Sequence, residues 1–368
     1  MRIAFYAPLK PPDHPVASGD RGVARLLFEA LRRAGHEPFI VSRLRSFDAS
    51  GDARHQARIA RIGERSAARL LHRWRRDADQ RPELWFTYHL YYKAPDWLGP
   101  AVSAALGIPY VVAEASHAAK RDGGPWISGH QAVERAIRLA DAVLGLNSAD
   151  REGVLPLLGS PERWMTLPPF LDARVYQAPD RAAAAAPRLI AVAMMRPGDK
   201  LASYRVLGTA LSRLLDRAWS LEIVGDGPAR GEVERALTPI RERVTYTGAL
   251  DPAGVAARLA GADLFVWPAI NEAFGLALLE AQASGLPAVV GASGGVADIV
   301  EDGMTGRLTP AADAEALAAA VRDLLDDPAL RLRMGGAARE KVLRQHDLGA
   351  AAARLAALIE SLHRARAA

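Results

Sequence analysis

The amino-acid sequence predicts an α/β fold divided between two domains. First, the 368 residues exceed one typical domain core and suit two domains of about 150 to 200 residues each. Second, short apolar runs bounded by turn residues are typical of buried parallel strands. Third, segments with apolar residues at helical spacing follow several of these runs, so that strand and helix alternate along the chain.

Composition excludes several classes of function. The chain has no cysteine, which excludes disulfides, thiolate nucleophiles and cysteine zinc sites. No apolar run reaches the length of a signal peptide or a membrane span, so we expect a cytoplasmic protein that is either free or peripheral on a membrane. The net charge of +5 permits nucleic acid, an anionic membrane or phosphorylated substrates as partners. No zinc-finger spacing or RNP-type aromatic segment supports nucleic acid.

The first domain is expected to span residues 1–176. Its strands are expected at 2–7, 84–88, 110–114, 141–147 and 164–170. A long loop with the sequence SGDRG joins the first strand to a helix at 23–34. In this loop Ser18 or Asp20 can cap the helix, and Gly19 lets the backbone come close to an anion. A purely structural loop would explain the same residues.

Residues 54–76 predict a basic amphipathic helix. Seven arginines recur at spacings of three or four, namely Arg54, Arg58, Arg61, Arg65, Arg69, Arg73 and Arg76. An apolar stripe runs beside them, formed by Ile59, Ile62, Ala67, Leu70 and Trp74. Such a helix can lie on a membrane, with its arginines at lipid phosphates and its apolar face in the acyl boundary. The alternative is an apolar face packed on the domain and arginines in water.

Two loops that follow strands of the first domain carry side chains suited to a sugar. The loop 89–97 concentrates four rings, those of His89, Tyr91, Tyr92 and Trp97. These rings either stack on sugars or form a satellite hydrophobic cluster. His117 follows the strand at 110–114, and open α/β sheets bind ligands beyond the carboxyl ends of their strands. His89 is a second candidate for a histidine that contacts the ligand.

After a linker at 177–187, a second domain is expected at 188–346. Its strands are expected at 189–194, 221–224, 264–268 and 287–290, and residues 244–250 are expected to carry Gly248 into a further loop. The second of these leads into GDGPARG, a tight glycine turn that suggests a dinucleotide-binding loop. The third glycine comes one place late and Pro228 starts the helix, so this fingerprint is poor. A last amphipathic helix is expected at 350–363.

The densest chemistry lies in residues 261–310. A buried strand is followed by a polar loop that contains Glu272, and a helix that carries Glu280 in its second turn comes next. Carboxylates accept hydrogen bonds from vicinal hydroxyls, so these two glutamates can hold a sugar and a ribose. Backbone amides at the positive end of the helix suit a diphosphate, and they belong to Phe274, Gly275 and Leu276. Two solvated charges on an ordinary helix are the alternative.

This stretch resembles the signature of family 4 of the retaining glycosyltransferases. The shared features are the two glutamates separated by seven residues, the helix sequence EAQASG and the glycine pair Gly294–Gly295. The sequence departs from the family at Ala269, where serine is usual, and at Asp298, where glutamate is usual. The resemblance implies the GT-B fold, in which two Rossmann-like domains face each other across a cleft. It also implies that residues 347–368 pack back onto the first domain.

The resemblance further implies a site for a nucleoside diphosphate sugar. The expected catalytic residues are His117, Glu272, Lys200 and Arg196. The expected donor contacts are Gly19, Arg196, Lys200, Gly225, Asp226, Gly227, Glu272, Ala273, Phe274, Gly275, Leu276 and Glu280. Lys200 and Arg196 would neutralise the departing diphosphate together with the helix amides, while Glu272 and His117 would orient the sugar. Neither a metal nor a cofactor is therefore expected.

The expected reaction moves a hexosyl group from this donor to a hydroxyl with retention, in envelope, exopolysaccharide or glycolipid synthesis. A sugar-nucleotide epimerase has the same architecture and would form product without an acceptor. A nicotinamide oxidoreductase would bind a dinucleotide, against which the poor glycine fingerprint argues. An inactive binding module would hold the donor without even slow hydrolysis. The glutamate pair and the cationic loop favour an enzyme.

Overall fold

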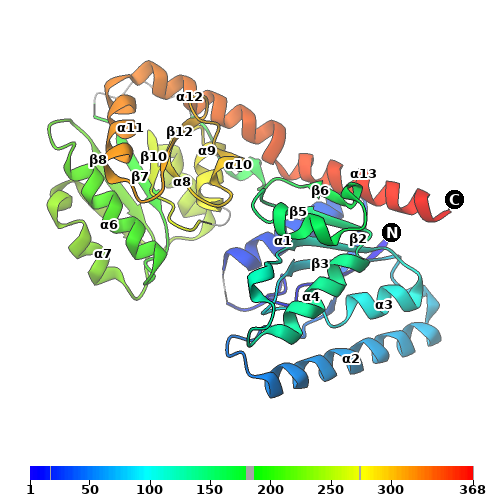
Figure 1. Ribbon diagram of the computed structural model, residues 1–368. Coiled ribbons are helices and arrows are strands. Elements are labelled where there is room, and N and C mark those ends of the chain that lie inside the picture. Colours follow the sequence, from blue (N-terminus) through cyan, green and yellow to red (C-terminus); the bar gives the residue numbers. More distant parts are fainter. Residues whose placement is uncertain (17, 180–185, 273–274, 368) are drawn as a thin grey trace. The chain divides into compact units, whose positions relative to one another are not determined.

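The chain forms two compact units (Figure 1). The computed structural model describes residues 1–16, 18–179, 186–272 and 275–367. Unit 1 comprises Met1–Pro168 and Leu348–Ala368, and unit 2 comprises Pro169–Asp347. Each unit holds a six-stranded sheet with helices packed against it, so the predicted pair of Rossmann-like domains is confirmed.

The sheet of unit 1 has the strand order β2-β1-β3-β4-β5-β6, and all neighbouring strands are parallel. Its strands are β1 (Arg2–Tyr6), β2 (Glu37–Ser42), β3 (Leu84–Leu90), β4 (Tyr110–Ala115), β5 (Ala142–Gly145) and β6 (Trp164–Thr166). The central strands β3 and β4 are apolar along nearly their whole length, because helices cover both faces of a parallel sheet. Trp85, Phe86 and Tyr110 fill this core.

Helices from both ends of the chain complete unit 1. They are α1 (Gly19–Arg33), α2 (Ala53–Arg76), α3 (Gly99–Leu106), α4 (Ile127–Leu139), α5 (Arg151–Val154) and α13 (Leu348–Ala367). Helix α1 begins four residues before the expected start at residue 23, because the Ser18 side chain caps it by accepting a hydrogen bond from the Arg21 amide. Helix α13 packs against α1, and Arg366 near its end donates to Asp141.

The predicted basic helix exists as α2, but its apolar face is covered by unit 1. Ile59, Ala67 and Trp74 are each at most 8% exposed, and α2 packs against α3 and α4. Gly63 brings the helix so close that an added Cβ would lie 2.4 Å from the Cβ of Trp97. This packing supports the alternative in which the apolar face lies on the domain, although Ile62 of the same stripe is 40% exposed. The seven arginines of the stripe are all exposed, as the alternative required.

Across the described ranges, every helix is either too short or too polar to span a lipid bilayer.

The sheet of unit 2 has the order β12-β11-β10-β7-β8-β9 and is also parallel throughout. Its strands are β7 (Arg188–Val192), β8 (Ser220–Val224), β9 (Val244–Gly248), β10 (Leu264–Trp267), β11 (Ala288–Ala292) and β12 (Gly306–Pro310). Its helices are α6 (Asp199–Ser212), α7 (Arg230–Ala236), α8 (Pro252–Gly261), α9 (Leu276–Ala283), α10 (Val296–Ile299), α11 (Ala314–Asp326) and α12 (Pro328–Lys341). A π-helical segment, Val342–His346, follows α12.

The boundary between the units falls at Pro168, whereas the sequence analysis placed the end of the first domain at residue 176. Leu171, Ala173 and Tyr176 explain this difference, because their buried side chains belong to the core of unit 2. The Leu171 amide also donates to the His346 carbonyl, which fixes this segment to the end of unit 2.

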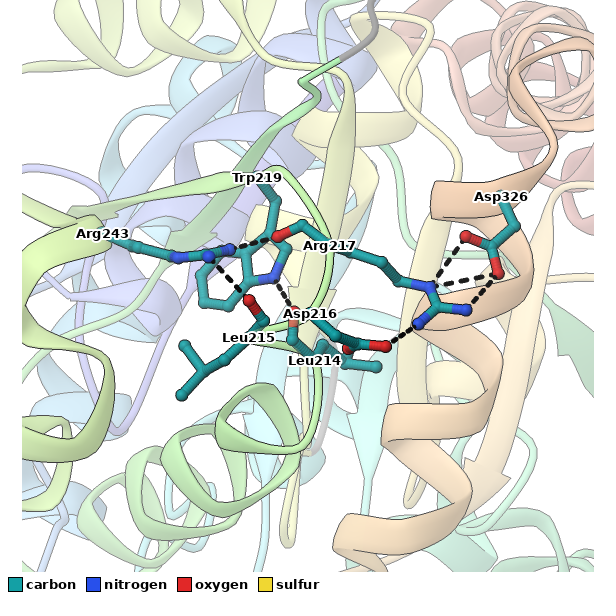
Figure 2. A network of polar contacts seen from close by, with 7 residues as sticks. All are labelled: Leu214, Leu215, Asp216, Arg217, Trp219, Arg243 and Asp326. Carbon is teal, nitrogen blue, oxygen red and sulfur yellow. Dashed lines mark hydrogen bonds and ion pairs between the residues drawn. The ribbon is translucent and has the colours of Figure 1, made fainter.

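A polar network holds the turn that leads into β8 (Figure 2). The Trp219 indole is buried and donates to the Leu214 carbonyl at 2.7 Å. The Arg243 guanidinium lies 4.8 Å from the centre of the Trp219 ring and donates to the Arg217 and Leu215 carbonyls. The exposed Arg217 side chain forks onto Asp326 at the end of α11. Because this last pair is exposed, the buried indole is the main anchor of the turn.

Candidate functional site

Residues expected to bind the donor meet at the carboxyl edge of the unit 2 sheet. Strands β10, β7 and β8 are neighbours, and the segments that follow them carry Glu272, Lys200 and Asp226. Since the carboxyl ends of parallel strands share one edge, these segments converge there. The Lys200 ammonium forms an ion pair with Glu272 and lies 5.6 Å from the centre of the Trp267 ring. These three side chains line one pocket, together with Gly275 and Leu276.

The first turn of α6 positions both members of this ion pair. Lys200 is the second residue of α6, and the loop that carries Glu272 is tied to the same turn by two hydrogen bonds. Asn271 donates to the Asp199 carboxylate at 3.1 Å, and the Ile270 amide donates to the hydroxyl of Ser203 at 3.1 Å. The start of α6 therefore carries the lysine and also holds the loop of the glutamate. The side chains of Lys200 and Glu272 are 26% and 20% exposed.

The loop that carries Glu272 has a strained backbone. Ala269 and Asn271 have φ angles of 53° and 49°. These angles lie in the left-handed region, which residues other than glycine rarely occupy. Each such residue costs on the order of 1–3 kcal/mol and persists where the surrounding structure imposes it, often at functional sites. This observation singles out the loop independently of the glutamate pattern.

The predicted glycine turn brings backbone against backbone at the same edge. Gly225 and Gly227 have φ angles of 147° and 156°, and an added Cβ would lie 1.9 Å from the Ala193 carbonyl oxygen and 2.3 Å from that of Met195. The Met195 amide donates to the Asp226 carbonyl at 2.9 Å. Both glycines are thus required for the loops after β7 and β8 to close on each other.

We expect Gly225→Ala to lose about 1–3 kcal/mol of unfolding free energy, because the new methyl group must displace the β7 loop from its close contact. Urea denaturation measures this loss. Gly231→Ala is the matched control, since Gly231 lies in α7 with open space around its Cα, and alanine is the better helix former there. Equal unfolding midpoints for the two variants would contradict the prediction.

Glu280 lies in the second turn of α9, as expected, but its partner was not foreseen. The Tyr176 hydroxyl hydrogen-bonds to its carboxylate, and burial raises the pKa of Glu280 to about 7. Gly275 caps the start of α9 with a φ angle of 65°. Two expected donor contacts, Ala273 and Phe274, lie outside the described residues.

The raised pKa of Glu280 predicts a pH dependence of stability. Below about pH 4.5 the carboxyl is protonated in both the folded and the unfolded chain, so its stabilising contribution is complete. As the pH rises to about 7, the unfolded chain loses this proton first, so the unfolding free energy falls. Thermal melts across this range should therefore show a smaller loss for Glu280→Gln than for the wild type. Glu340→Gln, at a 75% exposed side chain, should follow the wild type, and parallel curves for all three would refute the assignment.

Arg196 is exposed and lies on the approach to the same edge. Its carbonyl accepts a hydrogen bond from the Leu201 amide at 3.1 Å, which joins the β7 loop to the start of α6. Its predicted contact with a diphosphate stays a prediction.

A second polar cluster lies at the carboxyl edge of the unit 1 sheet. His89 and Glu114, near the ends of the adjacent strands β3 and β4, have φ angles of 64° and 59°. The Nδ1 atom of His89 lies 3.5 Å from the Asp20 carboxylate and 3.6 Å from that of Glu114. Burial raises the pKa of Glu114 well above its usual range and lowers the pKa of His89. Sequence reasoning named His89 as a second candidate but missed Glu114, whose signal is its place at a strand end.

The two remaining expected residues also belong to unit 1. Gly19 is the first residue of α1, and no heavy atom lies within 4 Å of an added Cβ, so its backbone is open to approach. Arg21 beside it donates to the His14 and Pro15 carbonyls and thereby holds the preceding loop. His117 follows β4, where its ring stacks on that of His130 with centres 4.4 Å apart. Its expected contact with the sugar stays a prediction.

Solved structures with this fold cover nearly the whole chain. Sucrose-phosphate synthase from Thermosynechococcus elongatus has a TM-score of 0.73 at 21% identity, over 99% of each chain. HepE of Anabaena, solved in complex with UDP, has a TM-score of 0.74 at 16% identity, over 98% of this chain and 100% of that one. These likenesses show a shared architecture.

Sequence comparison adds the family. Residues 186–327 match the family model of the group 1 glycosyl transferases. A D-inositol 3-phosphate glycosyltransferase of Nocardia farcinica is 30% identical over 286 residues, which are 71% of this chain and 63% of that protein. The chain is therefore similar to glycosyltransferases in sequence, and it spans about half the length of the first curated relatives that it matches. One of these, a GDP-mannose-dependent α-(1-6)-phosphatidylinositol monomannoside mannosyltransferase of Mycolicibacterium smegmatis, is 35% identical over 171 residues. Those residues span 44% of this chain and 44% of the mannosyltransferase.

Proposed function

We propose that this GT-B glycosyltransferase moves a hexosyl group from a nucleoside diphosphate sugar to a hydroxyl, with retention at the anomeric carbon, as expected of family 4. The observation that carries the proposal is the Lys200–Glu272 pair in the pocket at the carboxyl edge of unit 2. A cation suits the diphosphate and an acceptor carboxylate suits the sugar hydroxyls. The acceptor is proposed to be a glycolipid or a glycan, because one relative is named for a phosphatidylinositol monomannoside and the other for D-inositol 3-phosphate.

In the proposed mechanism the bond between the anomeric carbon and the diphosphate breaks first. Its electron pair leaves with the diphosphate, whose charge is stabilised by Lys200, by Arg196 and by the positive amino ends of α6 and α9. The acceptor oxygen then forms its bond on the same face of the sugar, and its proton passes to a diphosphate oxygen. Glu272 orients the sugar throughout. These cations supply the charge that a metal supplies elsewhere, so the transfer step is proposed without one.

Donor binding also requires a change of partner for Lys200. Its ammonium is paired with Glu272 in the structure. A diphosphate that binds Lys200 releases the Glu272 carboxylate, which is then available to accept from the sugar hydroxyls. The two interactions therefore support each other, and both need the first turn of α6 to keep its position.

For the acceptor we propose the polar cluster of unit 1. His89 and Glu114 offer buried polar atoms without a hydrogen-bond partner among the described residues, namely Nδ1 of His89 and Oε2 of Glu114. Buried polar groups left without partners cost free energy, which a bound hydroxyl group would recover. Their left-handed backbones are consistent with a functional position.

The test is a thermal-shift screen against nucleoside diphosphate sugars, since a selective ligand raises the melting temperature by mass action. The stabilising donor is then incubated with and without hydroxyl acceptors, and the products are identified by mass spectrometry. Transfer that requires an acceptor supports the proposal, and the anomeric configuration decides retention. Product formed from the donor alone would favour an epimerase, and stabilisation without any turnover would favour a binding module.

We also propose that the arginine face of α2 holds the protein to an anionic membrane surface by electrostatics alone. The seven exposed arginines support this, and each cation near such a surface contributes about 1 kcal/mol. The anionic cytoplasmic leaflet would then be the partner. Sedimentation with phosphatidylglycerol vesicles should show binding that weakens with salt and is reduced in a variant with Arg58, Arg65 and Arg69 changed to glutamine. Equal binding to neutral vesicles would contradict the proposal.

A further inference from the structure

Three metal-ligating side chains meet beside the end of β4. His117 lies in the segment that follows this strand, and His130 and Glu134 lie one turn apart on α4. One potential ligand atom from each side chain lies within 4.8 Å of those from the other two. Residues at positions i and i+4 of a helix share a face, so α4 presents an imidazole and a carboxylate together. The strand-end segment supplies the third ligand from the opposite side.

Each imidazole keeps one ring nitrogen for a ligand. Nε2 of His130 lies 3.1 Å from the Ala118 carbonyl, so this nitrogen carries the proton and Nδ1 is left with a lone pair. The ring of His117 bonds to the Gly153 backbone in the same manner. Carbonyl contacts of this kind fix the tautomer of metal-binding histidines.

The two remaining nitrogens, Nε2 of His117 and Nδ1 of His130, are buried without a hydrogen-bond partner among the described residues. His130 is only 3% exposed. Two buried, unpartnered lone pairs that converge with a carboxylate are costly unless something binds them, because buried polar atoms are nearly always satisfied. A cation can bind both nitrogen lone pairs and the carboxylate at once.

The carboxylate is oriented as well. Oε1 of Glu134 accepts from Arg138 at 2.7 and 3.1 Å. This arrangement reproduces the supporting bonds that position ligating carboxylates in metal sites. Two imidazoles and one carboxylate form a ligand set used for Zn²⁺ and other divalent first-row metals, with water in the open position.

We propose that His117, His130 and Glu134 bind one divalent transition-metal ion of the Zn²⁺ class, which clamps the segment after β4 onto α4. Zinc–ligand bonds of about 2.0–2.2 Å require that the three side chains close slightly around the ion. All three ligands belong to unit 1, and the metal takes no part in the proposed transfer. The site assigns the Nε2 atom of His117 to the metal and not to a sugar.

Metal binding is tested on the full-length, untagged protein after treatment with a chelator and dialysis. Titration with Zn²⁺ should give one ion per chain by calorimetry and by elemental analysis, and it should raise the melting temperature. Co²⁺ should give visible d–d bands of a site with nitrogen and oxygen ligands; the absence of cysteine removes competing thiolates. His130→Gln and Glu134→Gln should each weaken Zn²⁺ binding at least tenfold.

The control variants distinguish Zn²⁺ binding at this site from Zn²⁺ binding by other histidines of the chain. His72→Gln, at an exposed position on α2, should bind Zn²⁺ as the wild type does. If His130→Gln does not fold, Glu134→Gln decides, because Glu134 is only partly buried. No stabilisation by Zn²⁺, or equal affinity in wild type and Glu134→Gln, would overturn the proposal. None of these measurements uses a sugar donor, so failure of the metal site and failure of the transfer reaction are distinguishable.

Discussion

Lys200→Met is expected to lower kcat by a factor on the order of 10²–10³, the effect of removing one group that stabilises charge in a transition state. The reason is that Lys200 is the cation held in the pocket by the first turn of α6 and by Glu272. Methionine keeps most of the length of the side chain but removes the charge and the contact of the ammonium with Trp267. Steady-state kinetics with the donor found in the thermal-shift screen measures the change.

Arg205→Met provides the matched control for this variant. Arg205 lies on the same helix, and its exposed side chain reaches Glu232 at 3.7 Å on the surface. Its removal should leave kcat within about twofold, since exposed ion pairs contribute little. Glu272→Gln should mainly lower kcat with the donor found in the screen. Glutamine keeps an oxygen that accepts a hydrogen bond from a sugar hydroxyl, but it lacks the negative charge. A Lys200→Met enzyme as fast as Arg205→Met would remove the basis of the mechanism.

Asp96→Ala is expected to lower the unfolding free energy by about 3–5 kcal/mol. Asp96 is 2% exposed and accepts hydrogen bonds from the Leu98 and Gly99 amides, each at 2.8 Å. The Thr87 and Tyr110 hydroxyls also bond to it, at 2.5 and 3.1 Å. Alanine leaves all of these donors buried without an acceptor. Urea denaturation monitored by circular dichroism gives the change.

Asp96→Asn should recover part of this loss, since its amide oxygen still accepts from the start of α3 while the two hydroxyls can accept from its amide group. Asp13→Ala removes an exposed carboxylate paired with Arg43 and should change stability by less than about 0.5 kcal/mol. If Asp96→Ala and Asp13→Ala unfold at the same urea concentration, the Asp96 network does not hold β3, α3 and β4 together as inferred.

The pocket lined by Lys200, Trp267 and Glu272 was predictable because its residues lie in short segments with local signals. Glu272 and Glu280 occur in one stretch with a strand, a loop and a helix, and Lys200 follows the first strand of its domain. Their meeting depends on β7 and β10 being neighbours, which holds although Lys200 and Glu272 are 72 positions apart. The resemblance supplied this adjacency, since no spacing in the sequence specifies a strand order.

Other features depend on tertiary contacts that leave no local pattern. The sequence pattern of the apolar stripe of α2 is the same for a helix that contacts lipid and for a helix that packs on protein. The close approach of Gly63 to Trp97 shows that α2 packs on protein. Glu280 receives its raised pKa from burial beside Tyr176, far away in the sequence. Glu134 becomes a candidate metal ligand only because α4 lies next to the segment that carries His117. Strand β2, with a proline near its start, lies at the sheet edge and gave too weak a pattern to be identified.

Helix α13 has a consequence for how the protein is made. It joins unit 1 through Leu355 and Ile359, which are at most 1% exposed, and it packs on α1. During translation the ribosome releases α1 more than 300 residues before it releases α13. The apolar surface of α1 that contacts α13 therefore stays exposed until this helix has been synthesised. A chaperone that binds α1 during this time would raise the yield of native protein.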